Sequence, residues 1–275
     1  MIESSPEPPP SADLIRLLFF GDVVGEPGRR ALSDALPDLK KRLGADFVIV
    51  NGENAAGGRG ITPKIAIGLL RAGAAVITTG DHIWDQGEIM PYLETEPRVL
   101  RPANYPDGAP GAGSIVLEAA KAKVAVLNLQ GRTFMGPLDN PFLAAEAEVA
   151  RLRAETPIIL VDFHAEATSE KIALGRMLDG QVSAVIGTHT HVQTADESIF
   201  PGGTAYLSDA GMCGPAESVL GRKIEPVVER FRNHLPARFP VAKGDVRLCG
   251  AVIDVEIATG HATRITRLSE FVRCP

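Results

Sequence analysis

The chain has 275 residues, 45% hydrophobic and 23% charged, which suits one large globular domain or two small ones. Its formal net charge of -6 argues against a protein that grips a nucleic-acid backbone through clustered Lys and Arg. The apolar segments are strand-sized, so no membrane span is expected. The three cysteines form no CxxC pair, which argues against a disulfide framework or thiolate zinc site and favours a reducing cytoplasm.

The first residues differ in composition from the rest of the chain. Residues 1–13 are rich in Pro and Ser, carry no Lys or Arg, and lack the apolar run of a secretory signal. We therefore expect a disordered leader over 1–13 and one domain over 14–275, in a cytoplasmic bacterial protein.

From residue 15 onward, short apolar runs alternate with amphipathic stretches. The first third predicts strands over 15–20, 47–50 and 74–78, and helices over 29–43 and 63–71. Pro37 marks a point where the first helix bends or splits. Thr62 as cap and Pro63 at the first helical position predict a clean start for the second.

The remainder continues the alternation and becomes richer in strands. Strands are predicted over 114–117, 124–127, 158–163, 182–186 and 205–207, helices over 139–153 and 169–178, and a hairpin over 246–257 and 261–268. This order predicts an α/β fold with a second sheet packed on the first.

Polar clusters begin where predicted strands stop. They are Gly21-Asp22, Asn51-Gly52-Glu53-Asn54, Gly80-Asp81-His82, Asp162-Phe163-His164 and Gly187-Thr188-His189-Thr190-His191. In open α/β sheets, ligands bind beyond the carboxyl ends of the strands, so we expect the five clusters to converge on one place.

The residue types in these clusters are those that divalent metals prefer. Carboxylate, amide and imidazole groups recur at the strand ends, and no cysteine joins them. Two ions about 3.5–4 Å apart require several ligands and a bridging carboxylate, which this set can supply. His189 and His191, spaced i and i+2, would point to the same side of an extended backbone and address two neighbouring ions.

Several longer sequence motifs carry a family resemblance. These motifs are GDVVGEPGR, VNGENAAGGRGIT, TTGDHIWDQ, RPANYP, NLQGRTFM, DFHAEATSEK and GTHTHVQTAD. From about Leu17 to the C-terminal strands, the chain resembles the YmdB-type bacterial branch of the calcineurin-like metallophosphoesterase superfamily. The resemblance implies a four-layer α/β/β/α sandwich of two mixed sheets flanked by helices. It also implies 2′,3′-cyclic nucleotide phosphodiesterase activity at a dinuclear metal centre, with iron or manganese expected and magnesium or zinc left open.

The resemblance also implies residue roles. The ligands expected on the first ion are Asp22, Asn54 and His191. The ligands expected on the second ion are Asp81, His164 and His189. Glu53 resembles the bridging carboxylate, and His82 resembles the catalytic histidine that protonates the leaving oxygen without binding metal.

Asp81 departs from the family, whose third motif is usually Gly-Asn-His. The aspartate still offers an oxygen to the second ion but adds a negative charge. It should bind cations more tightly and attract an anionic phosphate less, or act as a neutral exchange of one oxygen ligand for another.

The expected function is hydrolysis of cyclic nucleotides such as 2′,3′-cAMP through a metal-bound hydroxide. Two alternatives remain open at this stage: a phosphomonoesterase or nucleotidase, and a regulatory metal-binding protein with little turnover. The expected partner is a small phosphate ester, with no stable nucleic-acid or membrane binding; a homo-oligomer is left open.

Other residues admit a functional and a structural interpretation. The glycines at 57, 58 and 60 permit close approach of backbone to substrate or form a flexible loop. Three aromatic side chains stack on a base or pack in the core and rim: Trp84, Tyr105 and Phe134. Asp209 follows a strand and could line the site, and Cys213 is expected to be a small packed residue. Two histidines lie outside the strand-end pattern: His234 and His261.

Overall fold

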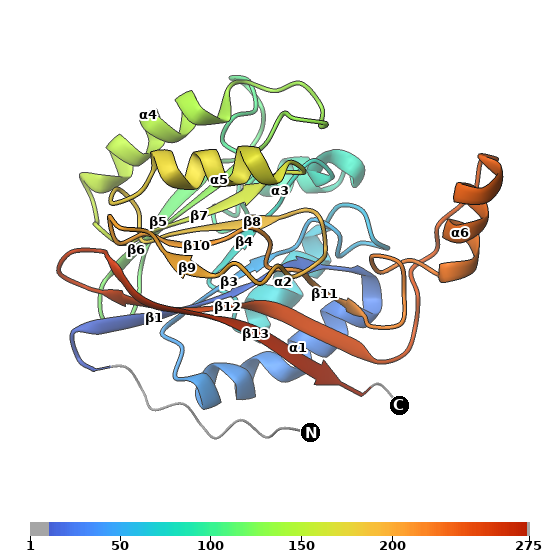
Figure 1. Cartoon of the computed structure of the whole chain (residues 1–275), viewed down its shortest axis with the longest axis horizontal. Helices are drawn as coiled ribbons and strands as arrows, with labels where there is room; N and C mark the ends of the chain where they lie inside the picture. The colour runs from blue at the N-terminus through green and yellow to red at the C-terminus, as the bar shows by residue number, and fades with distance from the viewer. Residues whose placement is uncertain (1–10, 274–275) are drawn as a thin grey trace.

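The computed structural model describes residues 11–273 and contains two β-sheets packed face to face, with helices on both outer faces (Figure 1). The four-layer α/β/β/α sandwich is therefore confirmed. Of the expected leader, residues 1–10 lie outside the described range. At Asp13, the last residue of that expected leader, the backbone carbonyl accepts a hydrogen bond from the Ile257 amide.

The first sheet has seven strands in the order β2-β11-β12-β1-β3-β4, with β13 paired to β12. Their bounds are β1 Leu14–Phe20, β2 Asp22–Val23, β3 Phe47–Asn51, β4 Val76–Thr78, β11 Met212–Pro215, β12 Val246–Glu256 and β13 Ala262–Val272. The strands β1, β3 and β4 are parallel, so their carboxyl ends meet at one edge.

The second sheet has six strands in the order β5-β6-β7-β8-β10-β9. Their bounds are β5 Ser114–Glu118, β6 Lys123–Gln130, β7 Ile159–His164, β8 Ala184–Thr188, β9 Ser198–Ile199 and β10 Ala205–Leu207. The central strands β6, β7, β8 and β10 run parallel, and β5 and β9 pair antiparallel at the two edges.

Helices cover the outer faces. Their bounds are α1 Gly25–Leu43, α2 Pro63–Ala72, α3 Ile89–Leu93, α4 Pro141–Arg153, α5 Thr168–Met177 and α6 Ile224–Asn233, with a 3-10 helix over Ile83–Asp85. In Figure 1, α1 and α2 lie on the outer side of the seven-stranded sheet and α4 and α5 on that of the six-stranded sheet, while α6 stands away from the layers. None of the helices within residues 11–273 has the length and hydropathy needed to cross a bilayer.

Strand β1 explains why the layers form. Leu18 and Phe20 join the core beneath α1 and α2, whereas Ile15, Leu17 and Phe19 join the core between the two sheets. Successive strand residues point to opposite faces, so Leu17–Phe20 are apolar at every position because both faces of the strand are covered there.

Several elements differ from the sequence prediction. Helix α1 begins at Gly25 rather than Arg29 and continues through Pro37 without a break. It ends at Leu43, and the capping residue Gly44 has a φ of 63°, a left-handed value that glycine adopts easily. The prediction did not include β2, β9, β11, α3 or α6, because two- to five-residue strands and helices are too short to show a period, and α6 lies on the surface.

Candidate metal centre

The strand ends bring the predicted polar residues together. Asp22 lies in β2 just beyond β1, Glu53 follows β3, and Asp81 follows β4 from the first sheet. His164 ends β7, and His189 follows β8 from the second sheet. The expected convergence of the clusters therefore occurs at the edge where the carboxyl ends of both sheets meet.

Four side chains form the tightest group. Ligand atoms of Glu53, Asp81, His164 and His189 all lie within 4.8 Å of one another. Around His164 Nε2, the Glu53 Oε1 atom lies at 3.1 Å, Asp81 Oδ1 at 3.2 Å and His189 Nδ1 at 3.0 Å. Two carboxylates and two imidazoles thus converge in the manner of a cation site.

A second group adjoins the first. Asn54 Oδ1 lies 3.1 Å from His191 Nε2, and Asp22 Oδ1 lies 3.9 Å from the same nitrogen. The Asn54 amide nitrogen donates to the Gly58 carbonyl at 3.2 Å. That bond turns the amide oxygen, the atom of this side chain that can bind a cation, toward His191.

Asp22 supplies an unpaired oxygen. Its side chain is fully buried, and Oδ2 accepts a hydrogen bond from the His189 amide at 3.1 Å. Oδ1 has no hydrogen-bond partner and lies 3.9 Å from both His164 Nδ1 and His191 Nε2. A buried carboxylate oxygen without a partner carries a large desolvation cost, which a bound cation would offset.

The backbone of the two histidines differs from the extended conformation assumed from their spacing. His189 has a φ of 100° and His191 a φ of 65°, both in the left-handed region. Strand β8 ends at Thr188, so the alternation of an extended strand does not apply beyond it. The loop turns His189 Nδ1 toward His164 and His191 Nε2 toward Asn54.

A buried chain of polar groups orients His164. Thr188 Oγ1 donates to Asp162 Oδ1 at 2.7 Å and lies 2.9 Å from His164 Nδ1. Because the hydroxyl has one proton, Nδ1–H of His164 donates to it and Nε2 is left free for the cluster. Sequence reasoning missed this role of Asp162 and Thr188. The signal was the i, i+2 spacing of Asp162 and His164 in one strand, which places both side chains on one face.

Mutual electrostatics shift the titration of the cluster. Burial alone raises the pKa of Glu53, but the adjacent His164 and His82 outweigh it and hold that pKa well below its usual range. Burial alone lowers the pKa of His164, but Glu53, Asp81 and Asp22 outweigh it and raise that pKa well above its usual value.

The remaining shifts follow burial. Burial, with the adjacent His164, lowers the pKa of His189 to about 4, so its imidazole is neutral near pH 7. Burial raises the pKa of Asp22 and, at Asp162, raises the pKa to about 6.

His82 lies at the edge of the group. Its Nδ1 is 3.2 Å from Glu53 Oε1 and 3.4 Å from Asp81 Oδ1, and its side chain is 21% exposed. Burial lowers the pKa of His82, but the hydrogen bond with Glu53 and the negative charge of that carboxylate raise it above the usual value overall. The ring is thus tethered by one nitrogen and reaches solvent.

The glycine-rich segment is held in a defined conformation. Gly57 and Gly58 have φ values of 64° and 90°, which favour glycine, and a Cβ on Gly58 would lie 2.4 Å from the Arg222 guanidinium. Arg222 donates to the Gly57 carbonyl at 3.1 Å and to the Gly58 carbonyl at 2.6 Å. The segment therefore supports Asn54 through the Gly58 carbonyl.

The three aromatic residues divide into two kinds. The rings of Trp84 and Tyr105 pack edge to face, with their centroids 5.4 Å apart. Both side chains pack against the core beneath α1 and α2. Burial raises the pKa of Tyr105 to about 12. Phe134 is 89% exposed with a φ of 64°.

Other sequence candidates lie apart from the cluster atoms. Cys213 is a buried core residue, and burial raises its pKa well above the usual value. His234 caps the end of α6, and His261 is exposed next to Gly203. Asp209 is buried and contacts the backbone of Thr190, between the two loop histidines.

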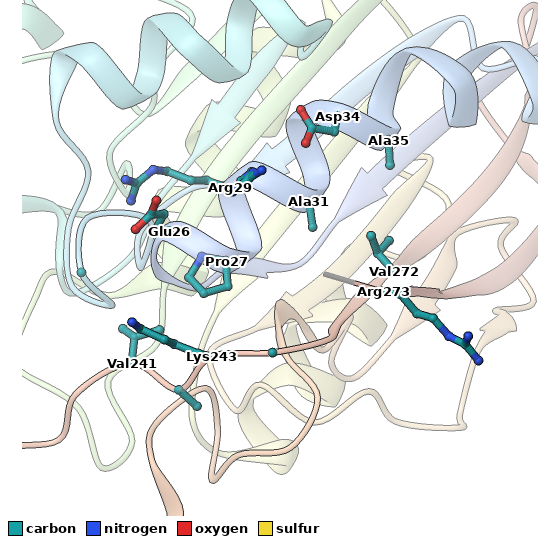
Figure 2. A pocket seen from close by; sticks show the side chains of 14 residues that line it. Glu26, Pro27, Arg29, Ala31, Asp34, Ala35, Val241, Lys243, Val272 and Arg273 are labelled. Atoms are coloured by element: carbon teal, nitrogen blue, oxygen red, sulfur yellow. The ribbon is translucent and has the colours of Figure 1, made fainter. Parts of the chain in front are cut away.

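A separate cavity of about 860 Å³ is lined by none of the cluster residues. Figure 2 shows Glu26 and Arg29 near the start of α1 and Lys243 on the facing segment. The lining contains no histidine, and its four basic side chains outnumber Glu26 and Asp34, so the cavity is not suited to a metal ion.

Comparison with known proteins gives consistent results over most of the chain. A family model described as YmdB-like protein matches residues 18–268. The 2′,3′-cyclic-nucleotide 2′-phosphodiesterase of Bacillus subtilis is 51% identical over 254 residues, covering 92% of this chain and 96% of that protein.

Solved structures agree with the sequence matches. A crystal structure described as a novel phosphatase from Mycoplasma pneumoniae has a TM-score of 0.89 at 36% identity and covers 95% of each chain. A hypothetical protein from Thermus thermophilus has a TM-score of 0.88 at 41% identity, covering 94% of this chain and 100% of that one.

Proposed function

The chain belongs to the YmdB-like family of metallophosphoesterases, and we propose that it hydrolyses phosphodiesters, specifically 2′,3′-cyclic nucleotides such as 2′,3′-cAMP, at a dinuclear metal centre. The observation that carries the proposal is the buried, unpartnered Oδ1 of Asp22 beside the convergent donors of Glu53 and the histidines. The name of the Bacillus subtilis relative supports the substrate class.

The donor set fits two cations. The residues proposed for one ion are Asp81, His164 and His189. The residues proposed for the other are Asp22, Asn54 and His191. Glu53 is proposed to bind both, since its Oε1 lies 3.1 Å from His164 Nε2, and its negative charge adds to the effect of burial in raising the pKa of Asp22. Oxygen and imidazole donors without thiolate suit iron or manganese, and also admit magnesium or zinc.

When bound, the ions would hold the phosphate oxygens and lower the pKa of a water molecule, supplying hydroxide near neutral pH. His82 is proposed to give a proton to the leaving ribose oxygen. The contact of its Nδ1 with Glu53 Oε1 at 3.2 Å holds the ring and leaves Nε2 free for that transfer.

Asp81 is proposed to serve as a ligand despite its extra charge. Its Oδ1 lies 3.2 Å from His164 Nε2 and 3.6 Å from His189 Nδ1, the two imidazole nitrogens proposed to bind the same ion. A carboxylate there strengthens cation binding and opposes an incoming phosphate anion. We also infer that the protein acts in the cytoplasm and that its substrate is a small phosphate ester.

The test combines elemental analysis of protein purified without added metal with assays on 2′,3′-cAMP and on an aryl phosphomonoester. Two metal equivalents and faster hydrolysis of the cyclic nucleotide are expected. Faster hydrolysis of the monoester would instead support a phosphomonoesterase. That alternative is kept because the similar structure from Mycoplasma pneumoniae is described as a phosphatase.

A His82→Ala variant separates an enzyme from a regulatory metal-binding protein. It should keep its metal and its fold while losing turnover, typically about 100- to 10,000-fold for a general acid. Equal turnover in the variant and the wild type would contradict the catalytic proposal.

A further inference from the structure

The loop that presents His189 and His191 is held in an uncommon backbone conformation. Both residues have positive φ values, 100° and 65°, and neither is glycine. Side chains with a Cβ rarely occupy this region unless surrounding contacts impose it. The neighbouring contacts therefore decide where the two imidazoles point.

Asp209 makes the contacts that hold the middle of this loop. Its Oδ2 accepts from the Thr190 amide at 3.0 Å and from Thr190 Oγ1 at 2.8 Å, while Oδ1 accepts from the Gly211 amide at 2.8 Å. The carbonyl of Asp209 also accepts from the Thr194 amide at 3.1 Å. The Asp209 carboxylate thus binds both the backbone amide and the side-chain hydroxyl of Thr190, the residue between the two histidines.

Lys171 completes the arrangement from helix α5. Its Nζ donates to Asp209 Oδ2 at 2.8 Å, and the two side chains are 2% and 1% exposed. Its aliphatic stem packs beside Gly187, two residues before His189, where an added Cβ would lie 3.0 Å from Lys171 Cδ. A buried carboxylate is stable only when paired, and Lys171 is its charged partner.

We propose that the buried Lys171–Asp209 ion pair is a positioning device for the His189–His191 loop, and that it sets the affinity of the chain for its metal ions. The proposal rests on the metal centre described above. Lys171 and Asp209 are positioning residues, since they act through Thr190 and offer no atom to an ion or substrate. Partners of metal ligands commonly tune affinity in this way.

Arg16–Asp254 is a matched pair that lacks this connection. Arg16 Nε donates to Asp254 Oδ1 at 2.6 Å and Nη2 donates to Oδ2 at 2.8 Å, and the side chains are 3% and 7% exposed. The pair joins β1 to β12 and has no contact with the loop histidines. It therefore reports the cost of losing a buried ion pair alone.

The test compares Asp209→Asn with Asp254→Asn in the full-length protein. In Asp209→Asn, either orientation of the amide places an NH2 group against a donor, because both carboxylate oxygens accept hydrogen bonds. Lys171→Met is a second variant, which keeps the stem beside Gly187 and removes the charge. Mn²⁺ binding to metal-stripped protein is titrated calorimetrically, and folding is followed by circular dichroism.

We expect Asp209→Asn and Lys171→Met to weaken Mn²⁺ binding about 10- to 100-fold, while Asp254→Asn keeps the wild-type affinity. Both classes of variant should lose thermal stability. If Asp209→Asn does not fold, Thr190→Val, which removes only the hydroxyl contact with Asp209, should still weaken Mn²⁺ binding relative to Asp254→Asn.

The outcomes separate the two proposals. Wild-type protein that binds none of Mn²⁺, Fe²⁺, Mg²⁺ and Zn²⁺ would contradict the dinuclear centre itself. Wild-type protein that binds Mn²⁺, with folded Asp209 or Thr190 variants that bind it as tightly as Asp254→Asn, would overturn the positioning role and leave the metal centre standing.

Discussion

Thr188 Oγ1 lies 2.9 Å from His164 Nδ1, and this contact decides which nitrogen of His164 faces the cluster. The same hydroxyl donates to Asp162, so it can only accept from the imidazole. His164 Nε2 is consequently held toward Glu53 and Asp81 without rearrangement.

A Thr188→Val variant should therefore bind metal more weakly, by about 10- to 100-fold, because His164 loses the acceptor that fixes its tautomer. Titration of metal-stripped protein measures the change. Thr204→Val is the control, since Thr204 is equally buried and its hydroxyl donates to the Val182 carbonyl at 2.7 Å. Equal affinities in the two variants would exclude the orienting role of Thr188.

An Asp81→Asn variant should turn over 2′,3′-cAMP faster or retain a different metal content. The substitution keeps an oxygen near His164 and removes a negative charge from the path of an anionic phosphate. Asp85→Asn makes the same change of charge at a similarly exposed side chain, 32% against 33%, and serves as the control. No difference in turnover or metal content would make the aspartate a neutral replacement.

Metal binding should release about one proton near pH 7, because a cation displaces the proton that His164 holds in the metal-free protein. The apparent affinity should rise with pH until the raised pKa of His164 is passed. Calorimetry in two buffers of different ionisation enthalpy measures the release. An affinity that stays constant over this pH range would contradict the prediction.

The raised pKa of His164 also makes the stability of the metal-free protein depend on pH. The pKa of His164 is raised on folding, so its contribution to stability is complete below about pH 6.5 and is lost as pH rises through the folded pKa. Urea denaturation of stripped protein at increasing pH should show this loss. Saturating metal should remove it, since the imidazole is then unprotonated at every pH tested.

An Asp254→Ala variant should destabilise the fold by about 3–5 kcal/mol, because the ion pair and both hydrogen bonds between the buried Arg16 guanidinium and the Asp254 carboxylate are lost. Phosphodiesterase activity of the folded protein should not change, since the pair has no contact with the candidate metal centre. Chemical denaturation measures the first effect and a 2′,3′-cAMP assay the second. Full stability in the variant would contradict the assignment of a buried pair.

Much of the candidate site was readable from the chain because strand ends are marked locally. Asp22, Glu53 and His164 each end or follow an apolar run, and parallel strands carry such residues to one edge. Helix starts were also local: Thr62 Oγ1 accepts from the Ile65 amide at 3.3 Å, as its position before Pro63 predicted.

The supporting residues could not be read in the same way. Lys171 lies three residues before Leu174, which is the spacing of a buried helix face. A lysine at such a position does not indicate which residue pairs with it. Asp209 lies 38 residues farther along the chain, and only the packing of α5 beside the segment that follows β10 brings the two together.

The sequence by itself determined the donor types, their place at the ends of strands and the alternating apolar runs that make a layered α/β fold, because these depend on neighbouring residues alone. Tertiary structure decided the left-handed turn of His189 and His191, the orientation of His164 and the unpaired oxygen of Asp22. Those features arise from contacts between segments far apart in the chain, which no local period or spacing encodes.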